Sequence, residues 1–337
     1  MKAVLIQEPH DLQVVDLPDP VPGAGEALIA VRYVGICGAD LASYTGNQPF
    51  TKYPCIPGHE FSAEIVSIPE NDRGLKAGDI VTCNPYFNCG TCYSCKRGLV
   101  NACTDNQTMG VQRDGAACGL LAMPIARLIP GGGLSAQELA LIEPFAISWH
   151  AVSRGHLKAG DKVLITGAGP IGLFALEAAR ARGAEVYISD ILDGRLEMAM
   201  QLGAMGTVNP QKEDLGAFTA RVTDGNGFDT CIEACGMPET FLACIDQAAF
   251  GGDILLIGNG KRETTFLHSI LLKKELNVYG SRNAYTKDFE ALIDLVKGGK
   301  VDVKQMVSCV YSIDDAKEAF EALEQNDGAL VKVLLEF

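Results

Sequence analysis

Residues 1 to about 145 alternate apolar and polar side chains in short runs separated by Gly and Pro. Three of these runs are LQVVDLP, EALIAVRYVG and EFSAEIVSI. A period of two places successive side chains on opposite faces of a strand, so each run fits a strand with one buried face. The first part of the chain is therefore predicted to fold as a compact antiparallel β domain.

A different pattern begins with EPFAISWHAVSRGHLKAGD, a helical run that ends in a turn. From there, apolar stretches such as KVLIT, AEVYISD and FDTCIEACG are each followed by a run with helical period. Apolar strands that alternate with helices are typical of βαβ units, whose parallel sheet is buried on both faces. Residues 146–284 are predicted to form a doubly wound parallel sheet of the Rossmann type.

The last part of the chain returns to a mixed pattern. KDFEALIDLVKGG and DDAKEAFEALEQND have the spacing of amphipathic helices, and LVKVLLEF is predicted to be a closing strand. A chain of 337 residues is longer than one hydrophobic core usually serves. We therefore expect an α/β protein of two domains, one formed by residues 1–145 and 285–337 and the other by the inserted residues 146–284.

Composition and charge exclude several classes of protein. The formal net charge of −14 disfavours a nucleic-acid partner, because affinity for a phosphate backbone needs a basic surface. No run of 18 apolar residues and no secretory signal pattern is present, so we expect no membrane contact and a cytoplasmic location. In that reducing compartment the twelve cysteines are not expected to form disulfides.

Four cysteines stand close together in the segment CNPYFNCGTCYSCKRGLVNAC. Their spacing is C-x2-C-x2-C-x7-C, and they are Cys89, Cys92, Cys95 and Cys103. Short gaps let neighbouring thiolates converge on one ion, and the longer loop brings in the fourth. A ferredoxin-type iron–sulfur cluster would need three residues before the last cysteine and a proline after it, whereas Thr104 follows here. The spacing predicts a closed structural zinc site in a lobe of about residues 83–105.

Further potential metal ligands stand in three separate segments, GICGAD, PGHE and LIEP. They supply one thiolate, one imidazole and two carboxylates: Cys37, His59, Glu60 and Glu143. Three protein ligands with an exchangeable fourth position form the pattern of a catalytic zinc site. The residue types favour such a site, although sequence spacing alone cannot join positions so far apart.

The segment KVLITGAGPIG predicts a dinucleotide-binding turn between a strand and a helix. Its residues expected to contact the cofactor are Gly167, Gly169, Pro170, Ile171 and Gly172. The helix N-terminus offers free N–H groups and a positive dipole end to the pyrophosphate. Asp190 ends the next strand, where a carboxylate binds the ribose hydroxyls and repels a 2′-phosphate. We therefore expect NAD rather than NADP, with Arg195 as a neighbour of the adenosine or a residue on the surface of the helix.

In their order along the chain these segments resemble the zinc-dependent medium-chain dehydrogenases. The motifs are VGICGAD, GHE, the four-cysteine lobe, ALIEPFAISWHA and GAGPIGL. The resemblance implies a GroES-like catalytic domain, an inserted Rossmann domain, one catalytic and one structural zinc ion, and a homodimer or homotetramer. It assigns the catalytic zinc to Cys37, His59 and Glu143. Because a second permanent glutamate would give the site a net negative charge, Glu60 is expected to exchange with water or substrate.

The IEP motif, where alcohol dehydrogenases carry a cysteine, points to the polyol branch of the family, such as sorbitol dehydrogenases. Within it, GNQPF, IEPFAIS and GSRNAYTKDF look most like enzymes that oxidise L-galactonate or L-gulonate at carbon 5. Asn47 and Gln48 are then expected to contact hydroxyls, and Arg282 to clamp the carboxylate or else to contact the cofactor. A neutral polyol or threonine is the alternative substrate.

One departure from the family concerns the proton. Relatives usually carry Ser or Thr two residues after the cysteine ligand and often His three further on, whereas this chain has Ala39 and Ala42. A hydroxyl relay contributes about 10²–10⁴-fold to a rate, less than the metal does, so an active enzyme is still expected. The alternative from another class is a zinc- and NAD-binding sensor or scaffold with impaired catalysis.

Overall fold

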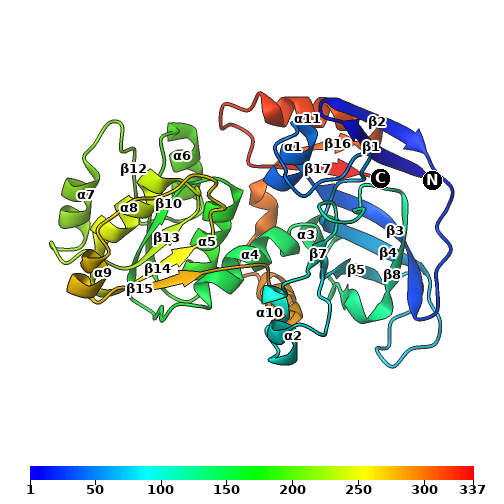
Figure 1. The fold of residues 1–337 in the computed structure, drawn as a ribbon, viewed down its shortest axis with the longest axis horizontal. Helices are drawn as coiled ribbons and strands as arrows, with labels where there is room; N and C mark the ends of the chain where they lie inside the picture. The colour runs from blue at the N-terminus through cyan, green and yellow to red at the C-terminus, as the bar shows by residue number, and fades with distance from the viewer. The chain divides into compact units, whose positions relative to one another are not determined.

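The computed structural model describes residues 1–337 and divides into two compact units, drawn in Figure 1. The first unit comprises Met1–Glu143 and Ala284–Phe337, and the second comprises Pro144–Asn283. None of the helices combines the length and the apolar character that a membrane span requires. The predicted architecture, a β-rich domain and a parallel α/β domain, is confirmed.

The first unit is built on a seven-stranded sheet. In spatial order its strands are β16 (Val307–Ser312), β17 (Lys332–Glu336), β3 (Glu26–Gly35), β4 (Glu60–Ser67), β5 (Ile80–Cys83) and β9 (Leu128–Pro130), with β8 (Leu120–Pro124) also pairing β3. Alternate residues of β3 and β4, such as Ile29 and Phe61, are buried in one core, as their period of two predicted. The strand pairs within residues 1–145 are antiparallel, as expected, whereas β16 and β17 from the C-terminal part of the chain pair in parallel. Helix α11 (Ala316–Glu324) connects them and returns the chain to the same end of the sheet.

Smaller elements complete the first unit. Two further strand pairs are β1 (Lys2–Glu8) with β2 (Asp11–Asp16), and β6 (Tyr86–Phe87) with β7 (Gln107–Thr108). The helices are α1 (Gly38–Tyr44), α2 (Tyr93–Lys96), α3 (Ala136–Leu139) and α10 (Thr286–Lys297), and the 3-10 turns are η1 (Val100–Ala102), η2 (Ile125–Arg127), η3 (Val303–Met306) and η4 (Ile313–Asp315). The pair β6–β7 closes the base of the four-cysteine segment, since one strand precedes it and the other follows it.

The second unit is a six-stranded parallel sheet with helices between the strands. Its spatial order is β12 (Gly206–Val208), β11 (Glu185–Ser189), β10 (Lys162–Thr166), β13 (Phe228–Glu233), β14 (Ala248–Leu256) and β15 (Asn277–Gly280). Numbered within this unit the order is 3-2-1-4-5-6, that of a Rossmann fold. The helices are α4 (Ile142–Val152), which begins in the first unit, α5 (Pro170–Arg180), α6 (Asp193–Gln201), α7 (Leu215–Val222), α8 (Pro238–Gln247) and α9 (Ser269–Lys274).

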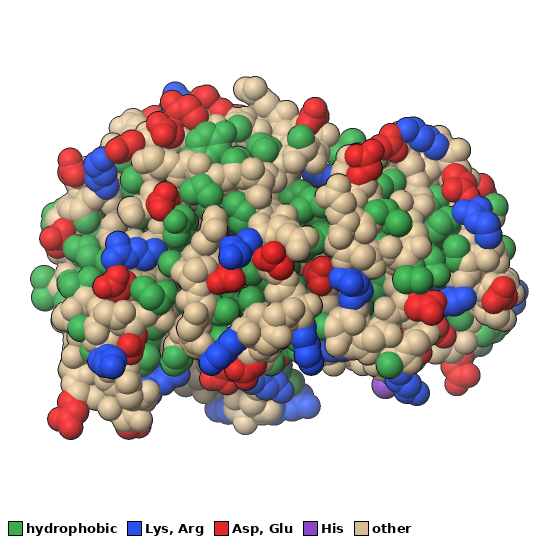
Figure 2. Space-filling model, turned by 180° about the vertical axis from the view of Figure 1, so that it is seen from behind, with side chains coloured by type: hydrophobic (Ala, Val, Ile, Leu, Met, Phe, Trp, Pro, Cys, Tyr) green, Lys and Arg blue, Asp and Glu red, His purple; other side chains and the backbone are tan.

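Charged side chains are distributed broadly over the surface. On the face shown in Figure 2, acidic and basic side chains are interspersed with apolar ones and no single basic field dominates. The negative net charge of the chain is therefore spread out on this face rather than gathered in one patch.

Candidate active site and metal centres

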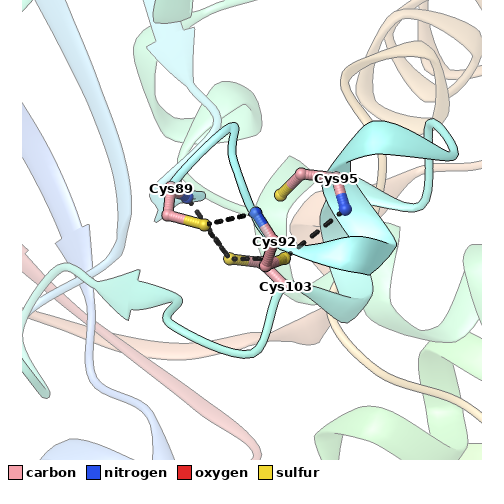
Figure 3. A group of neighbouring side chains, drawn as sticks. All are labelled: Cys89, Cys92, Cys95 and Cys103. Carbon is pink, nitrogen blue, oxygen red and sulfur yellow. Dashed lines mark hydrogen bonds between the residues drawn. The ribbon is translucent and has the colours of Figure 1, made fainter.

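The four cysteines of the lobe converge on one point, as Figure 3 shows. Cys92 caps the N-terminus of α2, Cys95 lies within that helix, and Cys103 follows η1. All four sulfur atoms lie within 4.8 Å of one another, and none forms a disulfide. This is the arrangement of a closed tetrahedral thiolate site.

The backbone of the lobe is arranged to stabilise thiolates. The N–H groups of Cys92 and Cys89 donate to the sulfur atoms of Cys89 and Cys103, each at 3.3 Å. The N–H groups of Cys95 and Thr104 lower the pKa of Cys92 to about 5. Desolvation and the neighbouring Cys92 sulfur, in contrast, raise the pKa of Cys95 to about 11. Four sulfur atoms so close together cannot all ionise without a cation, so the lobe fits a zinc ion.

Three of the four residues predicted to bind the catalytic zinc also lie close together. Atoms of Cys37, His59 and Glu60 lie within 4.8 Å of one another. Cys37 follows β3 and precedes α1, while His59 immediately precedes β4 and Glu60 is its first residue. Because β3 and β4 pair in antiparallel register, with Gly35 opposite Glu60, the end of one strand meets the start of the next. Strand pairing thus joins the two segments that sequence spacing could not.

Asp40 ties the two ligand segments together, a role that sequence reasoning missed. One carboxylate oxygen accepts a hydrogen bond from the backbone N–H of Cys37, and the other accepts one from Gly58, both at 2.9 Å. Asp40 stands at the third position of α1, where a carboxylate typically caps a helix, and that position was the available signal. The buried Nδ1 atom of His59 has no hydrogen-bond partner and lies 3.8 Å from Asp40 Oδ1.

Backbone contacts hold the loop that precedes His59. Gly58 adopts φ +99°, a conformation that favours glycine, and its carbonyl accepts the N–H of Ala116 at 2.9 Å. A Cβ atom on Gly115 would lie 2.3 Å from the Pro57 carbonyl oxygen, so this close approach requires glycine. The segment DGAACGL (residues 114–120) therefore supports the loop through its backbone and its glycine.

Glu143 lies at the start of α4 and is 2% exposed. It does not belong to the tight group of Cys37, His59 and Glu60, although it interacts electrostatically with His59 and Glu60. Burial raises the pKa of Glu143 to about 7, and the charge of Glu60 acts in the same direction. The hydroxyl of Tyr86 donates a hydrogen bond to Glu143 Oε1.

Lys332 is a second residue that sequence reasoning missed. It opens β17, and its Nζ atom lies 2.5 Å from Glu60 Oε2, with both side chains 2% exposed. Burial alone would lower the pKa of this ammonium, but Glu60 and Cys37 outweigh it and raise the pKa. The signal was a lysine inside the apolar run LVKVLLEF, where a buried charge needs a partner.

The nucleotide turn has the predicted strand–turn–helix form. Gly167 adopts φ +104°, Gly169 caps α5, and Pro170 occupies the first turn of that helix. A Cβ atom on Gly172 would lie 1.8 Å from the Gly167 carbonyl oxygen, so the turn closes only with glycine there. Ile171 lies in the first turn of α5, beside the backbone N–H groups that can face a pyrophosphate.

Asp190 and Arg195 line a cavity of about 450 Å³ together with Gly167. The Asp190 carboxylate accepts hydrogen bonds from the backbone N–H groups of Ala168, at 2.7 Å, and Leu192, at 2.9 Å. These bonds fix the carboxylate at the end of β11. The cavity is of a size that a nucleoside can enter.

Comparison with known proteins agrees with this geometry. The chain matches the alcohol dehydrogenase GroES-like domain over residues 23–132 and the zinc-binding dehydrogenase family over residues 170–298. It is 36% identical to L-galactonate-5-dehydrogenase of Escherichia coli, over 100% of this chain and 99% of that protein. The chain belongs to the zinc-dependent medium-chain dehydrogenases.

Other dehydrogenases of this family align along most of their length. A sorbitol dehydrogenase of Halalkalibacterium halodurans is 32% identical, over 96% of this chain and 94% of that protein. A crystal structure from Escherichia coli, described as a short chain alcohol dehydrogenase (rspB) complexed with NADH, has a TM-score of 0.93 and 29% identity, over 100% of this chain and 99% of that chain.

The family membership settles the enzyme class. The chain is a zinc-dependent, NAD-linked alcohol or polyol dehydrogenase, as predicted. The residues present fit its cofactors: four thiolates converge in the lobe, and the buried Nδ1 of His59 has no partner beside Cys37 and Glu60. A thiol, an imidazole and a carboxylate this close together are the donor types that zinc binds.

The residues predicted to contact substrate lie in both units of this dehydrogenase. Asn47 and Gln48 follow α1, their backbone N–H groups donate to the Ala42 carbonyl, and Asn47 Nδ2 donates to Thr45 Oγ1 at 3.0 Å. Arg282 is exposed in the second unit, just beyond β15. Their roles toward substrate stay predictions.

Proposed function

We propose that this dehydrogenase transfers a hydride from a secondary alcohol of a sugar acid, a hexonate such as L-galactonate or L-gulonate, to NAD. The similarity that carries the substrate class is the 36% identity to L-galactonate-5-dehydrogenase, which extends over 100% of the chain. The motifs GNQPF and GSRNAYTKDF support the same class. In this proposal the first unit binds the substrate and both zinc ions, and the second unit binds NAD through Gly167, Gly169, Pro170, Ile171, Gly172, Asp190 and Arg195.

We assign the structural zinc to the four cysteines of the lobe and the catalytic zinc to Cys37, His59 and Glu143, with Glu60 as the exchangeable carboxylate. The two glutamates differ in what balances their charge. Glu60 has the ammonium of Lys332 at 2.5 Å, whereas Glu143 has only a neutral phenol as its donor. The charge of Glu143 therefore requires a cation more strongly than that of Glu60 does.

The chemistry divides between the cofactors and the protein. Zinc, when bound, supplies a Lewis acid that favours ionisation of the substrate hydroxyl, and NAD accepts the hydride. The chain positions these groups: Asp40 fixes the segments of Cys37 and His59, and Lys332 keeps Glu60 available to leave the metal. Ala39 and Ala42 cannot carry a proton, so in this proposal water takes the proton from the buried site.

Substrate selection is assigned to polar groups of the loop after α1 and to Arg282. Asn47 and Gln48 donate to hydroxyl groups, and Arg282 binds the carboxylate in a bidentate pair. A charged hydrogen-bonded pair contributes about 1.5–3 kcal/mol, which corresponds to roughly 10–100-fold in kcat/KM. Arg282→Met should therefore raise KM for a hexonate by that factor while leaving KM for sorbitol nearly unchanged.

The proposal is tested by measuring NADH formation with the purified zinc enzyme on hexonates, hexitols and threonine. We expect kcat/KM for L-galactonate or L-gulonate to exceed that for sorbitol and threonine by at least about tenfold. A preference for a neutral polyol would refute the sugar-acid proposal and would favour the activity named for the sorbitol dehydrogenase relative.

The alanines at positions 39 and 42 favour a second candidate, a zinc- and NAD-binding sensor or scaffold with impaired catalysis. That candidate predicts two bound zinc ions and NAD binding without NADH formation on any substrate of the panel. Any turnover above the rate of a Cys37→Ser variant would refute it.

We further propose a homodimer or homotetramer in the cytoplasm. β15 is an edge strand of the six-stranded sheet, and its Val278 side chain is 38% exposed, so the strand can pair with a second copy. Light scattering after gel filtration tests the oligomeric state.

A further inference from the structure

Tyr86 is a buried polar residue to which the proposed mechanism gives no role. Its side chain belongs to β6, three residues before Cys89, and it is 6% exposed. Its hydroxyl donates to Glu143 Oε1, although the two residues are 57 positions apart. A buried tyrosine hydroxyl usually finds a hydrogen-bond partner, and here that partner is the carboxylate of a proposed metal ligand.

The backbone of Tyr86 is held by Arg127. The Nη1 atom of Arg127 donates to the Tyr86 carbonyl oxygen at 2.7 Å. The Nη2 atom of the same guanidinium donates to Asn88 Oδ1 at 3.3 Å. One planar side chain therefore holds the backbone of Tyr86 and the side chain of Asn88, on either side of Phe87, and so helps to fix where the Tyr86 side chain points.

The aromatic ring of Phe87 strengthens this anchor. The guanidinium carbon of Arg127 lies 4.0 Å from the centre of the ring, and that of Arg113 lies 3.7 Å from it. Such close cation–π contacts stabilise the base of the lobe where β6 pairs with β7.

The same base contacts the metal-binding cysteines. Asn88 Nδ2 lies 3.7 Å from Cys95 Sγ, and the backbone N–H of Cys89 donates to Cys103 Sγ at 3.3 Å. A continuous set of contacts thus runs from the cysteine sulfur atoms through Asn88 and Arg127 to Tyr86, and from its hydroxyl to Glu143.

We propose that Tyr86 is a positioning residue that orients the Glu143 carboxylate toward the catalytic zinc and makes the affinity of that site depend on the folded cysteine lobe. The hydrogen bond engages Oε1 and leaves Oε2 for the metal. Carboxylates that bind metals are commonly oriented in this way, and loss of the orienting partner weakens metal binding by about 10–100-fold. The inference rests on the proposed ligand role of Glu143.

The test removes the hydroxyl alone, with Tyr86→Phe in the full zinc enzyme. Zinc release is followed as the concentration of a competing chelator is raised, and Cys37→Ser identifies the release phase that belongs to the catalytic site. In Tyr86→Phe we expect zinc to leave the catalytic site at a chelator concentration about 10–100-fold lower than in the unaltered enzyme (the catalytic phase). Release of zinc from the cysteine lobe (the lobe phase) should occur at the same chelator concentration in both proteins. Excess zinc should restore most of the lost kcat.

Tyr93→Phe is the matched control, because Tyr93 lies in the same lobe and is 73% exposed. It loses the same atom and should release both ions as the unaltered enzyme does. If Tyr86→Phe also released both ions normally, or released both more easily together with a lower Tm, the positioning role would be refuted. An equal shift of the catalytic phase in Tyr93→Phe would refute it as well.

A second variant covers the case in which Tyr86→Phe does not fold. Arg127→Lys keeps the charge and removes the planar fork, so it should shift the catalytic phase in the same direction by a smaller factor. An unchanged catalytic phase in a folded Arg127→Lys would overturn the inference. If Glu143→Gln bound the catalytic zinc ion with unaltered affinity, the proposed ligand role of Glu143 would be refuted. If the unaltered enzyme bound both zinc ions but did not oxidise hexonates, only the proposed substrate would be refuted.

Discussion

Replacing Lys332 by methionine tests how the buried carboxylates of the first unit are held. Lys332 Nζ and Glu60 Oε2 are 2.5 Å apart, and both side chains are 2% exposed. At an effective dielectric constant of about 20, two unit charges at that distance attract by about 7 kcal/mol before desolvation is counted. Removing one partner of such a buried pair leaves the other uncompensated and costs about 3–5 kcal/mol. Methionine retains most of the apolar stem of the lysine side chain, so the change in the free energy of unfolding should come mainly from the loss of the positive charge.

Thermal unfolding followed by circular dichroism measures this cost. In a domain of 150–250 residues each kcal/mol shifts Tm by about 2–4 °C, so Lys332→Met should lower the Tm of the first unit by roughly 6–20 °C. Lys304→Met is the control, because Lys304 Nζ lies 3.7 Å from Glu138 Oε1 with a side chain that is 50% exposed. An exposed pair contributes only about 0–1 kcal/mol, so its Tm should change by less than about 4 °C.

A double-mutant cycle with Glu60→Gln isolates the pair. Each single variant should be strongly destabilised, and the double variant should lose about 1–3 kcal/mol less than the sum. In the zinc enzyme, where the metal would compensate Glu60 in place of the ammonium, the loss of Tm should lie at the lower end of the range of roughly 6–20 °C, zinc retention should rise and kcat/KM should fall. A Tm of Lys332→Met within the range of the control, or an additive cycle, would show that the reasoning about this pair is wrong.

Three further predictions concern the cofactor sites. Cys103→Ser should lose the lobe zinc and unfold at lower temperature, and metal analysis that still found two ions per chain would contradict a closed thiolate site. Gly172→Ala should weaken NAD binding at least about tenfold in a fluorescence titration, because its Cβ would lie 1.8 Å from the Gly167 carbonyl oxygen, whereas Gly194→Ala meets no atom within 4 Å and should bind NAD normally. Asp190→Asn should lower kcat/KM for NAD roughly 10–100-fold and reduce the preference of the enzyme for NAD over NADP. An equal loss of kcat/KM with NAD and with NADP would show that Asp190 does not discriminate between the two nucleotides.

The elements whose signals are local could be predicted from the sequence. KVLIT followed by GAGPIG forms β10, the glycine turn and α5, because the apolar run, the glycines and Pro170 all act within a few residues. The closing strand was also predicted, yet its parallel pairing with β16 was not. Which strand lies beside another depends on the path of α11 between them, and periodicity carries no information about that path.

Contacts between distant positions could not be predicted in the same way. Lys332 and Glu60 are 272 positions apart, so the lysine was assigned only to a strand. The position of Asp40 near the start of α1 indicated a helix cap, but not its second contact, with Gly58 in another loop. Tyr86 was missed because its partner, Glu143, is 57 positions away. The ligand types were predicted, but the structure groups Glu60 rather than Glu143 with Cys37 and His59.

The two glutamates can share one buried site because each negative group there has a partner of a different kind. Asp40 accepts two backbone N–H groups, and Glu60 faces the ammonium of Lys332. Cys37 lies beside His59, and the carboxylate of Glu143 accepts the Tyr86 hydroxyl; as a thiolate and a carboxylate the two would together match the charge of one zinc ion in the proposed site. In the proposed site, Glu60 can therefore leave the metal without becoming an unpaired buried charge, since Lys332 lies 2.5 Å from it. An exchangeable position on the zinc depends, by this reasoning, on a lysine at the far end of the chain.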